Sequence, residues 1–486
     1  GEGPPQSQPF LQYYDRIPLS LTAGEHHLAV AVVHLGTIAG TCGGLRAELI
    51  GPDGEVLTAT GPDWRCLLSP AWRRKTQAFT MNKTVPFQEQ LDAGRLPDGW
   101  PTPAVDDADW PAAALVPNRQ PNQTGNWSRL VARDIPRLEE TMVGAEAVTR
   151  VAQHTDLANR FRREDLSISL SAAGEEPSRI TVEGAENLTS EGGGPVTIQG
   201  STDHLAGGYE GRADASILLD FGRVVTGYPE LDISGPAGSR VEIGYAERLV
   251  DGHFNNAIEG LFADQLTLGE TRRAWSPLGW RAFRYLKLRF READEPVTLH
   301  RLQVRRVRYP FELRGEFSCD SGTLEQVFGI SRETLRLCSV DALMDTPWRE
   351  AAQWLGDVAA VTVPGVETCF GDTVLPRKFF RQSASNAHPT GLLSNISNIV
   401  NYAWPSAIPD YSLWWLIGLH DHYRYSGETD LLEAFYPQAV NILHAHLPFM
   451  REDGLIHEMP YWVFIDWADV DRRGACAPYN AIFYGA

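Results

Sequence analysis

The sequence predicts a multidomain α+β protein in which antiparallel β-sandwich domains come first and a helical domain follows. Its 486 residues are more than one core usually holds, which predicts about three domains. Up to residue 316, β-rich segments are separated by Pro and Gly turn signals roughly every 8 to 12 residues. From Phe317 the apolar residues follow the period of amphipathic helices. Strands that precede helices, rather than alternating with them, argue against a doubly wound fold.

Residues 1–140 are expected to form the first β domain. The apolar stretch 26–36 predicts a strand, and residues 45–60 alternate around a Pro-Asp-Gly turn, which predicts a hairpin. Two segments rich in Pro, Gly and polar residues, 101–127 and 171–200, predict long loops.

Residues 141–316 are expected to form further β-sandwich structure. Four strand-like segments, ASILLDFG, ELDIS, RVEIGYAERL and FRYLKLRF, follow one another with turn signals between them. In the last segment Leu286, Leu288 and Phe290 should face a core. Lys287 and Arg289 alternate with them and should face water.

Residues 317–486 are expected to form the helical domain. Helices are predicted at 321–340, with Ser321 as N-cap, and at 347–370, 373–387, 411–425 and 429–446, with another from Pro478. Gly427 stands where a C-cap glycine is expected. The last helix runs apolar and uncapped into Ala486, which predicts that this domain continues beyond the sequence.

Composition excludes several classes of protein. A formal charge of -19 is unsuited to nucleic acid or an anionic membrane. No apolar run approaches the roughly 20 residues that span a bilayer. The signatures of serine hydrolases, Rossmann folds and P-loop proteins are missing from the sequence. Two histidine pairs, His420 with His422 and His444 with His446, have a spacing of two, which places the members of each pair on opposite sides of a helix. No metal site is therefore expected. Six scattered cysteines favour a reducing, cytoplasmic compartment, but the sequence begins with Gly1, which leaves secretion open.

The segment DTPWREAAQWLGD, residues 345–357, is the strongest candidate for catalysis. If it is helical, Glu350, Trp354 and Asp357 share one face at spacings of four and seven, with Asp345 and Arg349 close by. An indole next to a carboxyl group excludes water, and a second carboxylate repels charge; both raise a carboxyl pKa. Such an acid can protonate a glycosidic oxygen.

Acidic residues and tryptophan occur together twice more. Asp410 stands at a predicted helix start with Trp414 one turn on, and Asp466 adjoins Trp467 in a predicted loop. Capping and dipole effects alone also place acidic residues at helix starts, and tryptophan is commonly a core residue. Three such clusters within one domain nevertheless favour a sugar-binding pocket.

These residues resemble the bacterial α-L-rhamnosidases of glycoside hydrolase family 78, whose signature is roughly D-[CT]-P-x-x-E-x-x-x-W-x-G-D. Further resemblance lies in FGDTVLPRKFFRQSA, GLLSN, PDYSLWW, YSGETDLLEAFYP, FIDWADVD and APYNAIFYGA. Upstream, LDFGRVVTGYPELDISG and GWRAFRYLKLRF resemble the β domain that precedes the catalytic domain. The segment YYDRIPLSLTAGEHHLAVAVVHLG resembles a jelly-roll accessory domain. The resemblance covers nearly the whole sequence.

The resemblance implies an inverting exo-glycosidase without a cofactor that removes terminal α-L-rhamnose from glycosides or oligosaccharides. Residues 317–486 would then be the first part of an incomplete (α/α)6 barrel. Glu350 matches the general acid, and the residues expected to bind substrate are Asp345, Arg349, Trp354, Asp357, Asp410, Trp414, Asp466 and Trp467. The family's general base is a late Glu preceded by Trp, a pair that this sequence lacks, so it is expected beyond Ala486, in the remainder of the polypeptide.

Two other interpretations remain open from the sequence. The same barrel could carry a glycosidase or phosphorylase for another sugar, or the chain could be a carbohydrate-binding protein without catalysis. A homodimer is also left open.

Overall fold

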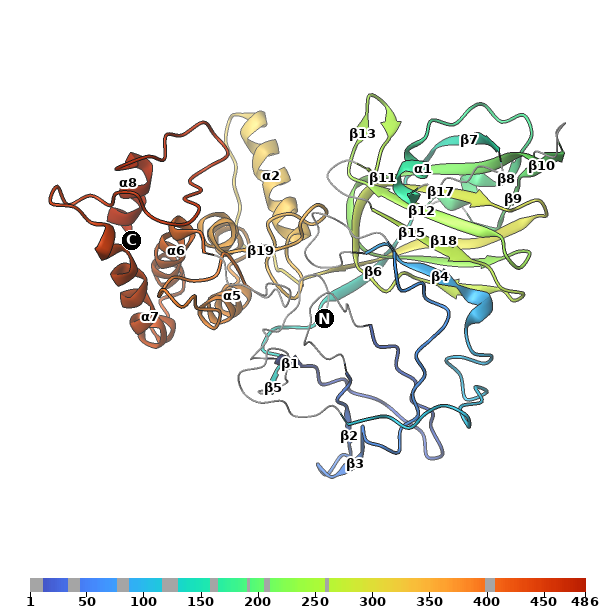
Figure 1. Ribbon diagram of the computed structural model, residues 1–486, viewed down its shortest axis with the longest axis horizontal. Coiled ribbons are helices and arrows are strands. Elements are labelled where there is room, and N and C mark those ends of the chain that lie inside the picture. Colours follow the sequence, from blue (N-terminus) through green and yellow to red (C-terminus); the bar gives the residue numbers. More distant parts are fainter. Residues whose placement is uncertain are drawn as a thin grey trace.

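Most strands lie at one end of the molecule and most helices at the other (Figure 1). The computed structural model describes residues 12–33, 44–76, 87–115, 130–157, 165–189, 193–204, 210–257, 262–397 and 407–486. A large sheet assembly lies at one end, the helical part at the other, and the first strands lie beside the junction between them. The predicted order of strands before helices is therefore confirmed.

The β part is organised around one long strand. β11 (Glu210–Ser234) pairs with β7 (Ala147–Leu157) and β17 (Arg281–Arg291) through its first half, and with β16 (Arg273–Trp275) and β18 (Val297–Arg308) through its second. The main path runs β4-β15-β12-β17-β11-β18-β9-β8, and its further members are β4 (Gln90–Asp92), β8 (Thr181–Glu183), β9 (Val196–Gln199), β12 (Arg240–Ala246) and β15 (Ala263–Thr267). β6 (Glu139–Val143) and β10 (Ser201–His204) pair at its sides.

Glycines allow β11 to serve both halves of this assembly. Gly222 has φ +72° and lies in a register shift between Asp220 and Val225, where β11 departs from β17. At Gly227 a Cβ atom would lie 2.1 Å from the carbonyl oxygen of Arg305. A larger residue could adopt neither the left-handed φ nor this close approach without strain.

The alternation in β17 is only half as predicted. Leu286, Leu288 and Phe290 are buried in the sheet core as expected. Lys287 and Arg289 are also buried, so the prediction that they face water is wrong. The reason is α1 (Leu166–Ser171), a short helix that covers the other face of the sheet. Lys287 Nζ donates to the carbonyl oxygen of Leu170, and Arg289 donates to Ser169 Oγ.

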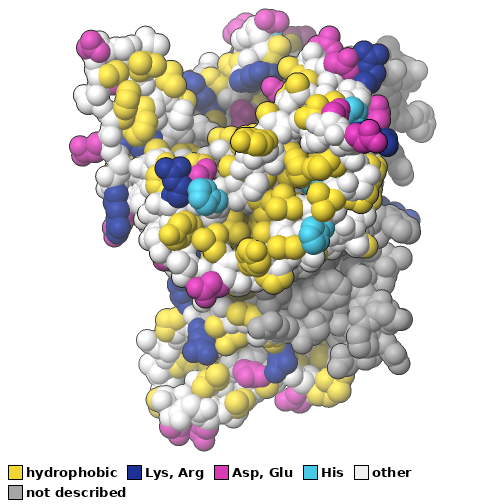
Figure 2. All heavy atoms as spheres, turned by 90° about the vertical axis from the view of Figure 1, so that its left-hand side faces the viewer, with side chains coloured by type: hydrophobic (Ala, Val, Ile, Leu, Met, Phe, Trp, Pro, Cys, Tyr) yellow, Lys and Arg dark blue, Asp and Glu magenta, His cyan; other side chains and the backbone are white. Residues whose placement is uncertain are grey.

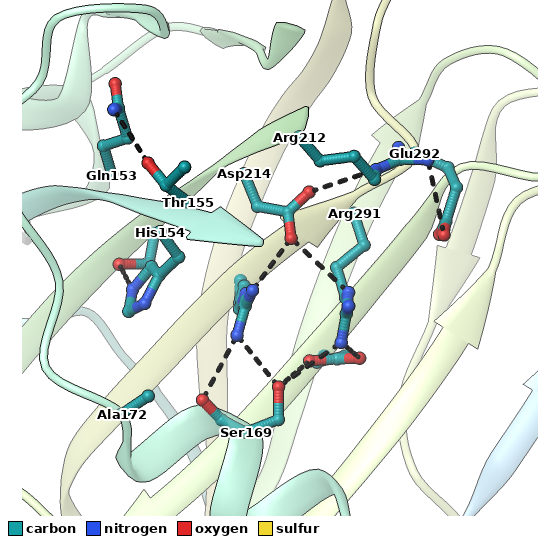
Figure 3. Close-up of polar contacts among 12 residues, drawn as sticks. Gln153, His154, Thr155, Ser169, Ala172, Arg212, Asp214, Arg291 and Glu292 are labelled. Carbon is teal, nitrogen blue, oxygen red and sulfur yellow. Dashed lines mark hydrogen bonds and ion pairs between the residues drawn. The ribbon is translucent and has the colours of Figure 1, made fainter. Parts of the chain in front are cut away.

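Buried ion pairs compensate the arginines on that second face. Asp214 accepts from Arg289 at 2.9 Å and lies 3.5 Å from Arg291 and 3.8 Å from Arg212 (Figure 3). Glu242 lies 3.4 Å from Arg291. Buried charges persist where partners of opposite charge and hydrogen bonds satisfy them, as these do.

The N-terminal part departs from prediction. β2 (Glu48–Ile50) and β3 (Val56–Ala59) form the expected hairpin. The strand predicted at 26–36 is wrong over residues 26–33, which are irregular and mostly exposed, and residues 34–36 lie outside the described residues. The apolar residues of this segment fit a strand, but a strand also needs a neighbouring strand to pair with, and the composition of the segment does not predict one. The pairs β1 (Gln12–Tyr14) with β5 (Leu130–Ala132) and β4 with β15 are parallel, so the antiparallel prediction is not general.

The two predicted loops have different outcomes. Residues 101–115 are irregular as expected, and most of the rest of the segment to 127 lies outside the described residues. The second, 171–200, contains β8 and β9, because its short alternating stretches find partners at the edge of the sheet.

Most predicted helices are confirmed. They are α2 (Gly322–Leu337), α5 (Val374–Ala384), α6 (Pro409–Ser426), α7 (Asp430–His446) and α8 (Ala477–Gly485). Ser321 holds the N-cap position of α2, although its side chain makes no capping bond. Gly427 ends α6 in the left-handed conformation at φ +73°. The helix predicted at 347–370 begins only at α3 (Leu355–Asp357) and continues through a π-helical turn, Val358–Thr362, into α4 (Val363–Phe370).

The helical end carries apolar surface. Figure 2, which faces this end, shows hydrophobic side chains over a broad part of it. Tyr436 on α7 and Tyr484 on α8 are among the exposed aromatic residues. Among the described helices, none combines the length and apolar character that a membrane crossing needs.

Candidate active site

The signature segment lies where the sheet part meets the helical part. Trp348 packs its ring against Phe262 of the β part, with ring centroids 4.4 Å apart, and Met344 and Ala351 join the same core. Leu343 and Leu355 belong instead to the core of the helices. Residues a few positions apart therefore anchor the segment in two cores, which restrains the polar residues between them.

The predicted single helix face is wrong. Residues 347–350 form a turn, Ala351 has φ +48°, and Trp354 belongs to the short strand β19 (Gln353–Trp354), which pairs with β20 (Ile396–Ser397). Asp345 closes the loop, because its Oδ1 accepts from the backbone N–H of Ala352 and its own N–H donates to the Ala352 carbonyl, each at 2.9 Å. These tertiary contacts outweigh the helical spacing of the sequence.

The loop nevertheless brings Glu350 and Trp354 into direct contact. Trp354 Nε1 donates to Glu350 Oε2 at 2.8 Å, and Arg349 Nη2 lies 3.2 Å from Glu350 Oε1. The side chain of Glu350 is 13% exposed. Both carboxyl oxygens are thus oriented by neighbours while the group keeps some access to solvent.

Two further carboxyl groups of the segment have perturbed acidities. Burial is the main cause that raises the pKa of Asp345 to about 7; the charges of Glu350 and Asp357 add to the rise, and the hydrogen bond from Ala352 opposes it. Burial also raises the pKa of Asp357, against a hydrogen bond from Tyr411 that lowers it. Carboxyl groups with raised pKa values gather where proton chemistry is needed.

Tyr411, at the start of α6, is a site residue that the sequence reasoning missed. Its hydroxyl bonds to Asp357, and its ring meets that of Trp354 edge to face, with centroids 6.4 Å apart. Gly356 permits this approach, because a Cβ atom there would lie 2.3 Å from the Tyr411 ring. The only signal in the sequence was the position of Tyr411 directly after Asp410.

Asp410 is fully buried and holds a loop. Its Oδ1 and Oδ2 accept from the backbone N–H groups of Phe464 and Ile465 at 2.9 and 3.1 Å. Ile465 has φ +59°, so these bonds support a strained turn. Trp414 is partly exposed one turn further along α6.

The loop that Asp410 holds presents Asp466 and Trp467 to solvent. Trp467 is 81% exposed and packs edge to face on Phe464, with centroids 5.2 Å apart. Phe464 in turn contacts Tyr411 at 5.7 Å. A continuous run of aromatic contacts therefore joins this loop to Trp354 and Glu350. Substrate binding by Asp466 and Trp467 stays a prediction.

The histidines that the sequence singled out lie apart from this segment. His422 is buried against Glu367, whereas His420, two residues earlier, is exposed. Among the described residues, no three His, Cys, Asp or Glu side chains are arranged to hold a metal ion.

Comparison with known proteins identifies the family. Residues 312–481 match the bacterial alpha-L-rhamnosidase 6 hairpin glycosidase domain, and residues 211–307 match the bacterial alpha-L-rhamnosidase concanavalin-like domain. Together they span more than half of the chain. The chain belongs to the bacterial α-L-rhamnosidases of glycoside hydrolase family 78. The first match covers the signature segment and the α6 start, and the second covers the β11–β18 assembly.

Proteins similar to this chain include three rhamnosidases, one matched by sequence and two by structure. An alpha-L-rhamnosidase of Formosa agariphila is 22% identical over an alignment of 307 residues, and the alignment covers 56% of this chain and 31% of that protein. The structure of the GH78 rhamnosidase of Bacillus sp. GL1 matches with a TM-score of 0.70 and 19% identity, covering 91% of this chain and 62% of that one. A Streptomyces avermitilis alpha-L-rhamnosidase complexed with L-rhamnose matches with a TM-score of 0.57 and 17% identity, covering 90% of this chain and 35% of that one.

The chain spans only part of the length of these relatives. It spans about a third of the Formosa protein and less than two thirds of the Bacillus structure. At these identities the structural matches establish the shared fold: mainly β-sheet domains with a six-hairpin helical domain.

Proposed function

We propose that the protein containing this chain is an inverting exo-α-L-rhamnosidase in which Glu350 is the general acid. One observation carries the proposal: the Glu350 carboxyl group is held between the Trp354 indole and the Arg349 guanidinium, beside two carboxyl groups of raised pKa. Membership of a rhamnosidase family supports rhamnosides as the substrate class.

In this mechanism Glu350 donates its proton to the glycosidic oxygen while the bond from that oxygen to the anomeric carbon breaks. Water attacks the anomeric carbon from the opposite face of the sugar and, as the new bond forms, gives its proton to a second carboxylate roughly 6.5–9.5 Å from the first. We assign Glu350 to the acid role only. Asp345, Arg349, Asp357 and Trp354 supply hydrogen bonds and an apolar face that suit a sugar ring.

The proposal extends to the wider architecture. Residues 317–486 are assigned to an (α/α)6 catalytic barrel, residues 141–316 to the β-sandwich, and residues 1–140 to a jelly-roll-like accessory domain. Asp410 is proposed to act on the substrate pocket through the loop that carries Asp466 and Trp467, with Trp414 beside it.

Replacing Glu350 tests the acid role in the natural protein. With an alkyl α-L-rhamnoside, whose leaving group needs protonation, Glu350→Gln should lower kcat/KM about a hundredfold or more. With p-nitrophenyl α-L-rhamnoside the loss should be smaller, because nitrophenolate leaves unaided. Near wild-type turnover of the alkyl substrate would sink the assignment. Glu433→Gln, on an exposed position of α7, is the matched control and should leave both rates unchanged.

Two further measurements separate the parts of the proposal. Proton NMR of the first product should show the β-anomer of L-rhamnose, whereas the α-anomer would contradict inversion. A panel of aryl glycosides tests the sugar, and faster turnover of another glycoside would replace rhamnose as the substrate class.

A further inference from the structure

A buried lysine on the β-sandwich lies beside a small cavity. Lys287, in the middle of β17, is 5% exposed. Its Nζ donates to the carbonyl oxygens of Leu170 and Ala172 at 2.8 and 3.1 Å, at the end of α1, and lies 5.7 Å from the centre of the Phe254 ring. An ammonium group has three N–H donors, and these carbonyls use two of them.

The cavity has a volume of about 40 Å³ and is lined by Lys287, Arg150, Ser216, His253 and Phe254, among others. A single water needs roughly 10–15 Å³ by this kind of measure. The space therefore suits a few waters or one small polyatomic ion. Most of its lining is apolar, but charged side chains of Lys287 and Arg150 reach it, and these distinguish it from the dry apolar cavities of protein cores.

Positive charge around this cavity exceeds negative charge. Within the part of the chain that the structure describes, neither Lys287 nor Arg150 forms an ion pair with a carboxylate; Arg150 instead donates to the carbonyl oxygen of Gly174 at 2.6 Å. Arg289 and Arg291, on the same strand as Lys287, are matched by Asp214 and Glu242. Among the described residues that line the cavity there are thus two cations, Lys287 and Arg150, and no carboxylate.

The acidities of nearby groups agree with that excess. Burial, together with the charges of Arg289 and Arg150, lowers the pKa of Lys287 to about 7. His154 bonds to Ser216, and burial together with the charges of Arg289, Lys287 and Arg150 lowers its pKa to about 3. His154 adjoins the ion pairs of Asp214 in the same region of the sheet (Figure 3).

We propose that this cavity binds a small oxyanion, such as a carboxylate or sulfate group, between the Lys287 ammonium and the Arg150 guanidinium. Ser216 also lines this space, although its Oγ already bonds to His154 and to the carbonyl oxygen of Ala152, so the two cations are the groups expected to bind the anion. The competing role of Lys287 is to cap α1 through the two carbonyls. Capping explains neither the position of Arg150 nor the cavity, and it predicts no anion binding.

Calorimetric titration of the natural protein with sodium sulfate and with sodium acetate, at constant ionic strength in NaCl, tests the proposal. A saturable site with a dissociation constant on the order of 1 mM is expected. Lys287→Met, which keeps the length and apolar stem, should weaken binding at least tenfold, as should Arg150→Gln at the exposed mouth. Arg272→Gln, which removes an exposed arginine paired with Asp232, should leave affinity unchanged.

The outcomes separate cleanly. No saturable heat with either anion, or wild-type affinity in Arg150→Gln, would overturn the proposal even if Lys287→Met fails to fold. Sulfate keeps its charge between pH 6 and 8, so its binding should weaken over that range as Lys287 loses its proton. Titration with methyl glucuronide then identifies the source of the anion. If methyl glucuronide binds as well as acetate, the natural ligand is an acid group on a saccharide. If acetate binds and methyl glucuronide does not, the natural ligand is a small free anion.

Discussion

Asp345 both closes the signature loop and has a raised pKa in the folded state. Its carboxyl group accepts from the backbone of Ala352, which closes the signature loop, yet burial and the charges of Glu350 and Asp357 disfavour its ionised form. A folded-state pKa of about 7 lies above the roughly 3.9 expected in the unfolded chain. The folded state therefore holds more protons than the unfolded state between these two values, and stability falls as pH rises through that window.

Asp345→Asn should remove this pH dependence while keeping an acceptor for Ala352. Relative to the wild type, the variant should have a similar Tm at pH 4 and a higher Tm at pH 8, where its free energy of unfolding should be larger by about 4 kcal/mol. Thermal melts from pH 4 to 8 measure it, with the exposed Asp320→Asn as control. A Tm difference that stays constant with pH would show that Asp345 ionises as it does in water.

At the scale of elements, the site depends on how closely α3 approaches α6. Gly356 in α3 leaves room for the Tyr411 ring, and that ring bonds Asp357 through its hydroxyl and contacts both Trp354 and Phe464. Tyr411 thus links the signature segment to the loop of Asp466 and Trp467. The contact between these two helices fixes where three of the predicted binding segments lie.

Gly356→Ala should disrupt this contact. The added methyl would overlap the Tyr411 ring, at an expected cost of about 1–3 kcal/mol. We expect a lower Tm and a loss of kcat/KM greater than that of Tyr411→Phe, which removes only the hydroxyl. Gly329→Ala in α2 is the matched control: a Cβ atom there meets nothing within 4 Å, so this variant should be neutral or slightly stabilising. Equal behaviour of the two alanine variants would contradict the packing argument.

At the scale of the whole molecule, the β part supports the site directly. Trp348 lies two residues before Glu350 and packs on Phe262, so the sheet assembly determines where the loop sits. An accessory role for the sheet would leave catalysis independent of this contact.

Trp348→Ala and Phe262→Ala should each lower stability by about 3–5 kcal/mol and reduce kcat. The double variant should lose less than the sum, because both changes remove the same ring contact. Denaturant unfolding and rhamnoside kinetics on the four proteins of the cycle measure this. Phe317→Ala, at a half-exposed ring where the helical part begins, should affect kcat little. Strict additivity in both measurements would argue against coupling through this contact.

Much of the helical part follows from the sequence, because α2 and α7 have long amphipathic patterns and α6 ends at a local signal, Gly427. The signature segment does not. Its residues have helical spacing, yet Ala351 adopts φ +48° and Trp354 joins a strand. Only contacts with Phe262, Ala352 and Ile396, all supplied by other segments or by loop closure, decide that conformation.

The sequence by itself therefore determined the order of β and helical domains, the family, and the set of residues that includes Glu350, because these depend on local pattern and residue identity. The tertiary structure decided how Trp354 reaches Glu350, that Tyr411 belongs to the site, and that Lys287 and Arg289 are buried. Each of these depends on which distant segment packs against a residue, and α1 covering the second face of β17 is a contact that no periodicity within β17 encodes.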